Sequence, residues 1–359
     1  MRKEVGTLSI RAVDLFCGVG GLTHGLARAG IDVVAGIDID PACRYPYEAN
    51  NEARFVEGDV NDLEASEVER LVGGADVSLI AGCAPCQPFS TYSRSGRSKR
   101  RGSDWQLVET FGRLVREVQP DLVTMENVPQ LLDHPVFSRF VEDLSGYSVG
   151  WSVVQAARIG VPQTRKRLVL VASRLGDVGL PLSQEGKEAR TVRQAIGGLR
   201  PIRAGESDPE DRLHVASRLS RVNLERIRHS KPGGTWRDWP EDLRAACHRK
   251  TSGATYPSVY GRMSWDEASP TITTQCFGYG NGRFGHPEQD RAISLREAAI
   301  LQTFPPKYKF VRPDEPVRFN VLGRLIGNAV PVRLGEAVGQ TLVAHAAQFT
   351  RPNHAVEAH

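Results

Sequence analysis

The sequence contains no run of about 18 or more apolar residues, which leaves no candidate for a transmembrane helix. Only 6 of its 359 residues are cysteine, too few for a disulfide-stabilised scaffold. Its first residues lack the long apolar stretch of a secretion signal, so we expect a cytoplasmic protein with no membrane partner. The excess of positive charge is small, with 46 Lys and Arg against 42 Asp and Glu, and does not by itself indicate a nucleic-acid partner.

Hydrophobic residues make up 40% of the chain and charged residues 25%, as is usual for a globular protein. The first half alternates short apolar runs with helical patterns such as 22–29. The runs that predict strands are 10–16, 31–37, 54–56, 76–81, 121–125, 149–154 and 168–172. Strands separated by single helices predict a doubly wound α/β domain with a mainly parallel sheet.

The pattern changes near Gly176. Residues 180–269 have little periodicity, and within them residues 211–250 hold ten Lys and Arg against five Asp and Glu. Helical periodicity returns at 294–301 and 334–347. At about 150 residues per domain, two domains are expected. We place them at 8–179 and 180–270, the second smaller and irregular, with a C-terminal segment 271–350 that returns to the first domain.

The first predicted strand runs into the glycine-rich turn Asp14–Gly21, which precedes a helix. Glycines let the backbone approach a ligand, and a helix N-terminus offers free N–H donors. A dinucleotide site would need a third glycine where Thr23 stands. Asp38, at the end of the second strand, could hold ribose hydroxyls, and Asp59 could accept from an adenine amino group. These features favour an adenosyl ligand without phosphates, with a tight turn and solvated carboxylates as the alternative.

Cys86 lies between Pro85 and Pro88 directly after the fourth predicted strand, where open α/β sheets bind substrates. The two prolines restrict the backbone and give the thiol a defined direction. A zinc site with Cys83 would need a second ligand pair, which the sequence lacks, so we predict no metal site. Buried packing stays open for either cysteine. The run Arg94–Arg101 carries five positive charges and suits a loop that closes over phosphates, or a solvated loop.

Together these motifs resemble the bacterial cytosine-5 DNA methyltransferases over nearly the whole chain. Each block is a modest signal alone, but six in the same order are specific. The blocks are Asp14–Gly21, Pro85–Ser90, Glu126–Val128, Gln163–Arg167, Arg296-Glu297 with Leu301–Pro305, and Gly327–Pro331. The basic segment 180–270 falls where the family has its target-recognition domain. Cys17 and Cys83-Ala84 depart from the usual residues, and we assign Cys83 to packing or loop support.

The resemblance implies methyl transfer from S-adenosylmethionine to carbon 5 of a cytosine that is flipped out of a specific duplex DNA sequence. Cys86 would add to carbon 6, and Glu126 would act at ring nitrogen 3. Arg167 would grip the cytosine carbonyl oxygen, with Arg165 on the same face of one strand, and Asn127 would position the loops. S-adenosylhomocysteine would be the product. The base that removes the carbon 5 proton is not assigned.

The resemblance also implies a cofactor site in which Ile39 replaces the aromatic residue that some members place against adenine. Its residues would be Asp14, Phe16, Gly18, Gly20, Gly21, Asp38, Ile39, Asp59, Val60, Pro85, Asn328 and Ala329. We expect a monomer that acts on double-stranded DNA, as the modification enzyme of a restriction-modification system with a companion restriction endonuclease.

Two alternatives remain open. The same chemistry could act on tRNA, but the sequence lacks the Cys-Phe-Thr element of the tRNA-methylating relatives. A sequence-specific DNA-binding regulator without turnover is the second, and the presence of Cys86, Glu126 and Arg167 argues against it.

Overall fold

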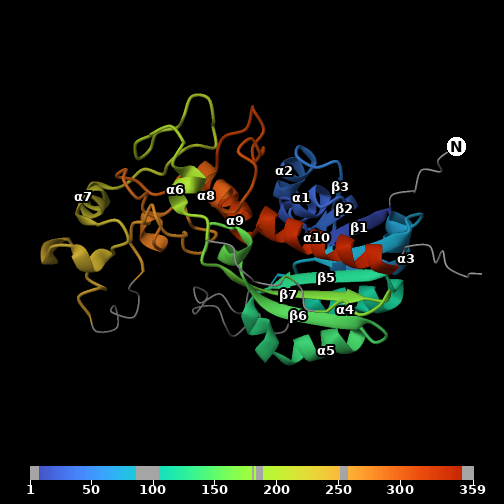
Figure 1. Cartoon of the computed structure of the whole chain (residues 1–359). Helices are drawn as coiled ribbons and strands as arrows, with labels where there is room; N and C mark the ends of the chain where they lie inside the picture. The colour runs from blue at the N-terminus through green and yellow to red at the C-terminus, as the bar shows by residue number, and fades with distance from the viewer. Residues whose placement is uncertain (1–7, 86–104, 180–181, 183–188, 251–257, 350–359) are drawn as a thin grey trace, which may run out of the picture. The chain divides into compact units, whose positions relative to one another are not determined.

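The computed structural model describes residues 8–85, 105–179, 182, 189–250 and 258–349. It contains a seven-stranded sheet of order β3-β2-β1-β4-β5-β7-β6 (Figure 1). Its strands are β1 (Ile10–Leu15), β2 (Asp32–Asp38), β3 (Arg54–Glu57), β4 (Val77–Gly82), β5 (Leu122–Asn127), β6 (Ser148–Gln155) and β7 (Lys166–Ser173). The pairs β1–β2, β1–β4, β2–β3 and β4–β5 are parallel, whereas β5–β7 is antiparallel. The predicted mainly parallel α/β sheet is confirmed.

Helices cover both faces of this sheet. On one face α3 (Ala65–Val72), α4 (Gln106–Val118) and α5 (Pro135–Asp143) share a continuous apolar core with the strands. Elsewhere α1 (Gly21–Arg28) packs so closely on α10 (Val332–Phe349) that a β-carbon on Gly335 would lie 2.9 Å from the Leu22 carbonyl oxygen. Further short helices described in this region are η1 (Pro41–Cys43), α2 (Arg44–Glu48), η2 (Val60–Asp62) and η4 (Pro129–Asp133), whereas η5 (Ala156–Ile159) belongs to the second compact unit. None of the described helices has the length and apolar content of a membrane span.

The chain separates into two compact units. The first contains the residues up to Val154, a piece that begins at Lys166, and the chain from Leu334 onward. The second contains Gln155–Arg165 and a long piece that ends at Arg333. The predicted segment 271–350 is therefore divided, because α8 (Leu295–Leu301) and α9 (Phe319–Asn328) belong to the second unit and most of α10 to the first.

Short elements and buried arginines build the second unit. Its described part holds isolated β-bridges rather than strands, with α6 (Val192–Ile196), α7 (Arg221–His229), η6 (Trp236–Asp238), η7 (Glu241–Leu243) and η9 (Tyr279–Asn281) besides α8 and α9. The Arg262 side chain donates to the carbonyl oxygens of Ile227, Ser230, His286 and Gln289. Because each donor finds a main-chain acceptor, the irregular backbone is satisfied without a sheet.

A buried ion pair anchors the start of α8. Both Arg291 terminal nitrogens lie 2.7 Å from the Glu297 carboxylate oxygens, and Ser294 closes a capping box with Glu297. Burial alone would raise the pKa of Glu297, but the hydrogen bonds and charge of Arg291 hold it at about 2. Burial lowers the pKa of the neighbouring His286 to about 4, so this imidazole is neutral at physiological pH.

In the first unit, a line of polar groups crosses from α2 to β1. The Tyr47 hydroxyl lies 3.0 Å from Thr23 Oγ1, which donates to Asp14 Oδ2 at 2.7 Å. Tyr47 is fully buried and reaches this position over Gly36 of β2. A β-carbon at Gly36 would lie 2.4 Å from the Tyr47 hydroxyl oxygen and within 2.6 Å of two ring carbons. Only glycine therefore leaves room for the tyrosine.

We expect Gly36→Ala to lower the free energy of unfolding by roughly 1–3 kcal/mol, since the added methyl group overpacks a buried ring. Gly58→Ala is the matched control, because a β-carbon there meets nothing within 4 Å and the backbone is not left-handed. Chemical denaturation of both variants measures the difference. Equal stabilities would show that the ring shifts without cost.

Candidate active site

The turn after β1 and the end of β2 are joined by a hydrogen bond. Gly18 donates its backbone N–H to Asp38 Oδ2 at 2.8 Å, and the second Asp38 oxygen accepts from the Asp40 N–H at 2.9 Å. Gly18 and Gly20 have φ of 52° and 83°, left-handed conformations that glycine adopts without strain. The predicted partners, the glycine turn and Asp38, therefore lie side by side at the carboxyl edge of the sheet.

The neighbouring candidates follow the same edge. Ile39, directly after β2, is 65% exposed, and Phe16 has a φ of 59° at the start of the turn. Asp59 caps η2 by accepting from the Asn61 N–H at 2.9 Å, and Val60 is buried. The Gly58 N–H donates to the Asp38 carbonyl oxygen at 3.1 Å and so holds the end of β3 beside β2. The ends of three adjacent strands thus carry these residues.

Asp14 is the buried carboxyl group beneath this turn. It is 1% exposed, and its Oδ1 has no hydrogen-bond partner within the described part of the chain. Burial raises its pKa to about 7, although the hydrogen bonds from Thr23 act in the opposite direction. The burial of the Cys17 thiol nearby likewise raises its pKa well above the usual value, so that thiol stays protonated. A buried carboxyl group with a raised pKa and one oxygen without a hydrogen bond is a candidate for a functional site.

A second carboxylate lies at the ends of β4 and β5, which pair with Gly82 opposite Met125. The following residue, Glu126, is 6% exposed. Its Oε1 forms an ion pair with Arg167 Nε at 2.9 Å, and its Oε2 accepts a hydrogen bond from Cys83 Sγ at 3.0 Å. The structure thus brings Glu126 and Arg167 together as the sequence motifs suggest. It also adds Cys83, which the sequence analysis assigned to packing or loop support.

Asn127 connects β5 to the segment that leads toward the predicted nucleophile. Its Nδ2 donates to the Ala84 carbonyl oxygen at 3.2 Å, and its Oδ1 accepts from the Val128 N–H at 2.8 Å. Pro85 is the last described residue of this segment and is exposed, whereas Ala84 is buried. Cys86 and the basic run 94–101 lie outside the described residues.

Arg165 and Arg167 do not lie on one strand. β7 begins at Lys166, so the prediction holds for Arg167 and is wrong for Arg165. The backbone before β7 pairs with residues of the second unit instead, because Thr164 donates its N–H to the Ser269 carbonyl oxygen at 2.8 Å. Arg165 Nη1 accordingly donates to the Ile272 carbonyl oxygen at 3.2 Å.

Two buried glutamines tie the motif blocks of the second unit together. Gln163 Nε2 donates to the Leu301 carbonyl oxygen and to Gln302 Oε1, each at 2.8 Å. Gln302 Nε2 in turn donates to the carbonyl oxygens of Ile326 and Ala329, at 2.8 and 3.2 Å. Hydrogen bonds from Gln302 to the main chain at Ile326 and Ala329 therefore fix the backbone around the predicted cofactor residues Asn328 and Ala329. Neither Gln163 nor Gln302 is among the predicted site residues, and the signal that the sequence offers for them is an amide next to apolar residues.

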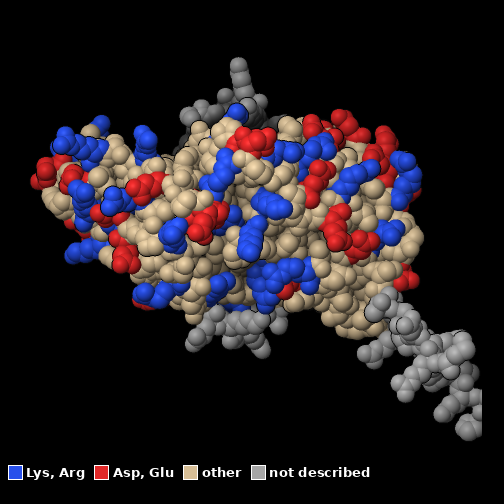
Figure 2. Space-filling model, turned by 90° about the horizontal axis from the view of Figure 1, so that it is seen from above, with Lys and Arg blue, Asp and Glu red and all other residues tan. Residues whose placement is uncertain are grey.

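The second unit also carries a basic, aromatic region. In α7, Arg221, Arg226 and Arg228 stand against one acid, Glu225. Figure 2 shows Lys and Arg side chains, with Asp and Glu among them, at the left of the view, the side on which Figure 1 draws α7. The Arg226 guanidinium carbon lies 5.2 Å from the centre of the Trp239 ring. Arginines held on aromatic rings are suited to contacts with phosphates or bases.

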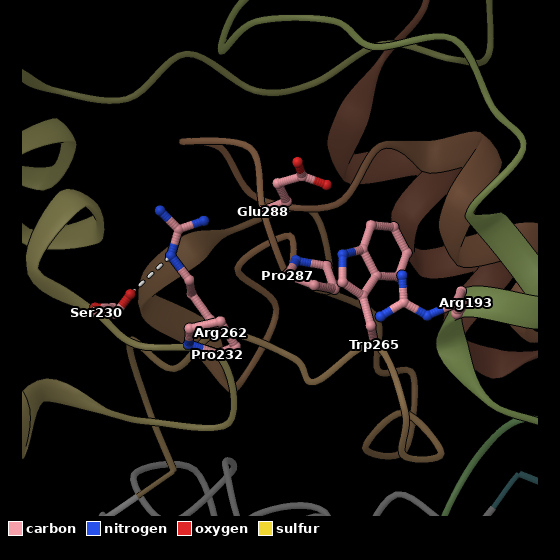
Figure 3. A pocket seen from close by; sticks show the side chains of 7 residues that line it. All are labelled: Arg193, Ser230, Pro232, Arg262, Trp265, Pro287 and Glu288. Atoms are coloured by element: carbon pink, nitrogen blue, oxygen red, sulfur yellow. Dashed lines mark hydrogen bonds between the residues drawn. The ribbon is translucent and has the colours of Figure 1, made fainter.

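A hollow of about 520 Å³ lies within the second unit, lined by Arg193, Ser230, Pro232, Arg262, Trp265, Pro287 and Glu288 (Figure 3). The Arg193 guanidinium lies over the Trp265 ring at 5.3 Å and is paired with Asp266. Arg262 already donates to main-chain carbonyl oxygens and to the Asp290 carboxylate. The hollow contains none of the predicted site residues. Within the described ranges, no group of His, Cys, Asp and Glu could hold a metal ion.

The chain is similar to known proteins over nearly its whole length. The type II methylase M.HgiDII of Herpetosiphon aurantiacus is 51% identical over 336 residues, which cover 92% of this chain and 94% of the relative. The type II methyltransferase M1.HphI of Haemophilus parahaemolyticus is 31% identical, with 94% and 87% covered.

A solved structure described as a DNA modification methyltransferase encoded within an E. coli prophage is similar with a TM-score of 0.68 and 25% identity. The similarity covers 94% of this chain and 100% of that one. The pattern of the C-5 cytosine-specific DNA methylase family matches residues 10–344. The chain belongs to this family and is a DNA (cytosine-5)-methyltransferase.

Proposed function

We propose that the ends of β1, β2 and β3 bind S-adenosylmethionine, the methyl donor that the family generally uses. The Gly18–Asp38 hydrogen bond supports this proposal, because it holds the Asp38 carboxylate beside the glycine turn at the sheet edge, where ribose hydroxyls could donate to it. Asp59 would accept from the adenine amino group, and Phe16, Ile39 and Val60 would contact the ring. Gly20, Gly21, Pro85, Asn328 and Ala329 complete the proposed set.

Asp14 fits a cationic ligand. When bound, S-adenosylmethionine supplies a methyl group on a positively charged sulfonium. The unpaired Oδ1 of Asp14 is buried beneath the turn, and a nearby positive charge would stabilise its ionised form. The buried carboxyl thus supports a sulfonium ligand over a neutral one.

The single observation that carries the catalytic proposal is the Glu126–Arg167 pair next to the segment that leads to Cys86. We infer that Cys86 adds as a thiolate to carbon 6 of the flipped cytosine, which makes carbon 5 nucleophilic toward the methyl group. Glu126 holds or protonates ring nitrogen 3 during this addition, and Arg167 binds the carbonyl oxygen. Asn127 fixes the segment before Cys86. Removal of the carbon 5 proton then allows elimination and frees the thiol.

We further propose that the second unit, with Arg165 at its boundary, recognises the DNA sequence. The arginines of α7 and the irregular basic stretch 211–250 support contacts to a duplex. Flipping would bring the target base to Glu126, since a stacked base is inaccessible. We infer a cytoplasmic monomer that modifies DNA in a restriction-modification system, alongside an endonuclease for the same site.

We expect Asp38→Ala to weaken S-adenosylmethionine binding at least tenfold, because the loss of charge-assisted hydrogen bonds costs roughly 1.5–3 kcal/mol. Isothermal titration calorimetry measures the dissociation constant. Asp32→Ala is the matched control, since Asp32 is an exposed acid at the other end of β2. An unchanged affinity for Asp38→Ala would exclude this carboxylate as the ribose ligand.

In the absence of cofactor, the ionisation of Asp14 should lower the free energy of unfolding as the pH rises. Its folded pKa of about 7 exceeds the ordinary value of 3.8, so between these values only the unfolded chain loses the proton. Relative to Asp14→Asn, the wild-type unfolding free energy should fall by roughly 2.6 kcal/mol from pH 5 to pH 8, most of it below the folded pKa, at about 1.4 kcal/mol per pH unit. Urea denaturation at both pH values measures this difference. A constant difference would show that the carboxyl ionises normally in the fold.

Cys86→Ser should abolish methyl transfer, because a serine hydroxyl is hardly ionised at neutral pH. It should still bind DNA and cofactor. Duplex DNA with 5-fluorocytosine at the target is the sharpest probe, since fluorine blocks the final elimination and leaves the enzyme attached. A complex of Cys86→Ser that survives denaturing electrophoresis, or an adduct that peptide mapping locates on Cys83, would contradict the proposed mechanism.

A further inference from the structure

Glu126 is held at both carboxylate oxygens. Arg167 Nε lies 2.9 Å from Oε1, and Cys83 Sγ lies 3.0 Å from Oε2. The thiol donates this hydrogen bond and Oε2 accepts it. Cys83 therefore contacts the proposed catalytic acid directly, although it stands three residues before the predicted nucleophile.

The main chain of Cys83 is anchored to the sheet. Its N–H donates to the Leu15 carbonyl oxygen at 3.3 Å, which continues the β1–β4 pairing by one residue. The next residue, Ala84, is buried, and its carbonyl oxygen accepts from Asn127 Nδ2 at 3.2 Å. Hydrogen bonds from β1 and β5 on either side thus fix the position from which the thiol reaches Glu126.

Contacts at both oxygens fix the orientation of the Glu126 carboxylate, which a contact at one oxygen does not. The terminal torsion angle of a glutamate side chain has a broad, roughly two-fold distribution. An ion pair at one oxygen therefore leaves the carboxylate plane able to rotate about this bond. A donor at the second oxygen fixes that plane. A carboxyl oxygen has two lone pairs, so Oε2 can accept from the thiol and still carry the proton that it shares with ring nitrogen 3 of the base.

We propose that Cys83 is a positioning residue, whose S–H group holds the Glu126 carboxylate in the plane required to meet ring nitrogen 3 of the target cytosine. The inference rests on the proposed role of Glu126. It gives the first cysteine of the Cys83–Cys86 pair a function in the reaction without contact to the substrate. It also predicts that a hydroxyl can replace the thiol, because a hydroxyl keeps a donor at this position.

The test is a double-mutant cycle. Cys83→Ala and Cys83→Ser are each made in the wild type and in Glu126→Gln. The single-turnover rate of denaturant-resistant adduct formation is measured with duplex DNA that carries 5-fluorocytosine, at saturating enzyme and S-adenosylmethionine. Calorimetric cofactor affinity, DNA affinity and the unfolding temperature are measured for every variant to register effects on folding and binding.

We expect Cys83→Ala to slow adduct formation by about 3–10-fold, the effect of one hydrogen bond of ordinary strength. Cys83→Ser should recover most of this loss, and cofactor and DNA affinities should stay within about twofold of wild type. In the Glu126→Gln background, Cys83→Ala should have little further effect, because it acts through that side chain.

A wild-type rate for Cys83→Ala would overturn the inference. So would an equal loss in both backgrounds, or a Cys83→Ser variant as slow as Cys83→Ala, since these results indicate packing alone. A Glu126→Gln variant with the wild-type rate would instead contradict the proposed role of Glu126, and the inference would fall with it. The single variants thus distinguish the two failures.

Discussion

The parallel register of β1, β4 and β5 is the constraint on which the first unit's site depends. Leu15 lies opposite Gly82, and Gly82 lies opposite Met125, so three strands end at one edge of the sheet. Each chain segment leaves the sheet at the same level, and the residues that follow must lie together. Glu126 and Cys83 meet for this reason, although 43 residues separate them in the chain.

Three buried carboxyl groups show how the fold controls charge. Glu297 is paired with Arg291 and stays ionised, with a pKa of about 2. Glu126 lies between a guanidinium and a thiol. Among the residues that the structure describes, the Thr23 hydroxyl is the one side-chain donor to Asp14, and burial raises the pKa of Asp14 to about 7. A buried charge without a partner is costly, so a protein keeps one where a ligand supplies the missing charge. We propose that in this chain the position is Asp14, beneath the glycine turn.

The two units are stabilised by different means. The first buries the apolar faces of a sheet against helices, and its backbone hydrogen bonds lie in the strand ladders. The second has isolated bridges in its described part, and arginine side chains such as Arg262 satisfy its carbonyl oxygens instead. Irregular backbone of this kind accepts changes in length and sequence more easily than a sheet does. It therefore suits the role in recognising a DNA sequence that we propose for this unit.

The sequence alone determined the sheet, the order of its first five strands along the chain, the glycine turn with Asp38, and the family, because strand and helix periodicities and short motifs are local. It did not determine that Arg165 lies before β7, or that Gln163 and Gln302 join the motif blocks. Nor did it reveal the contact of Cys83 with Glu126 or the missing partner of Asp14 Oδ1. These features depend on which distant residues the register of the strands and the packing of the second unit bring together, and on how much water that packing excludes.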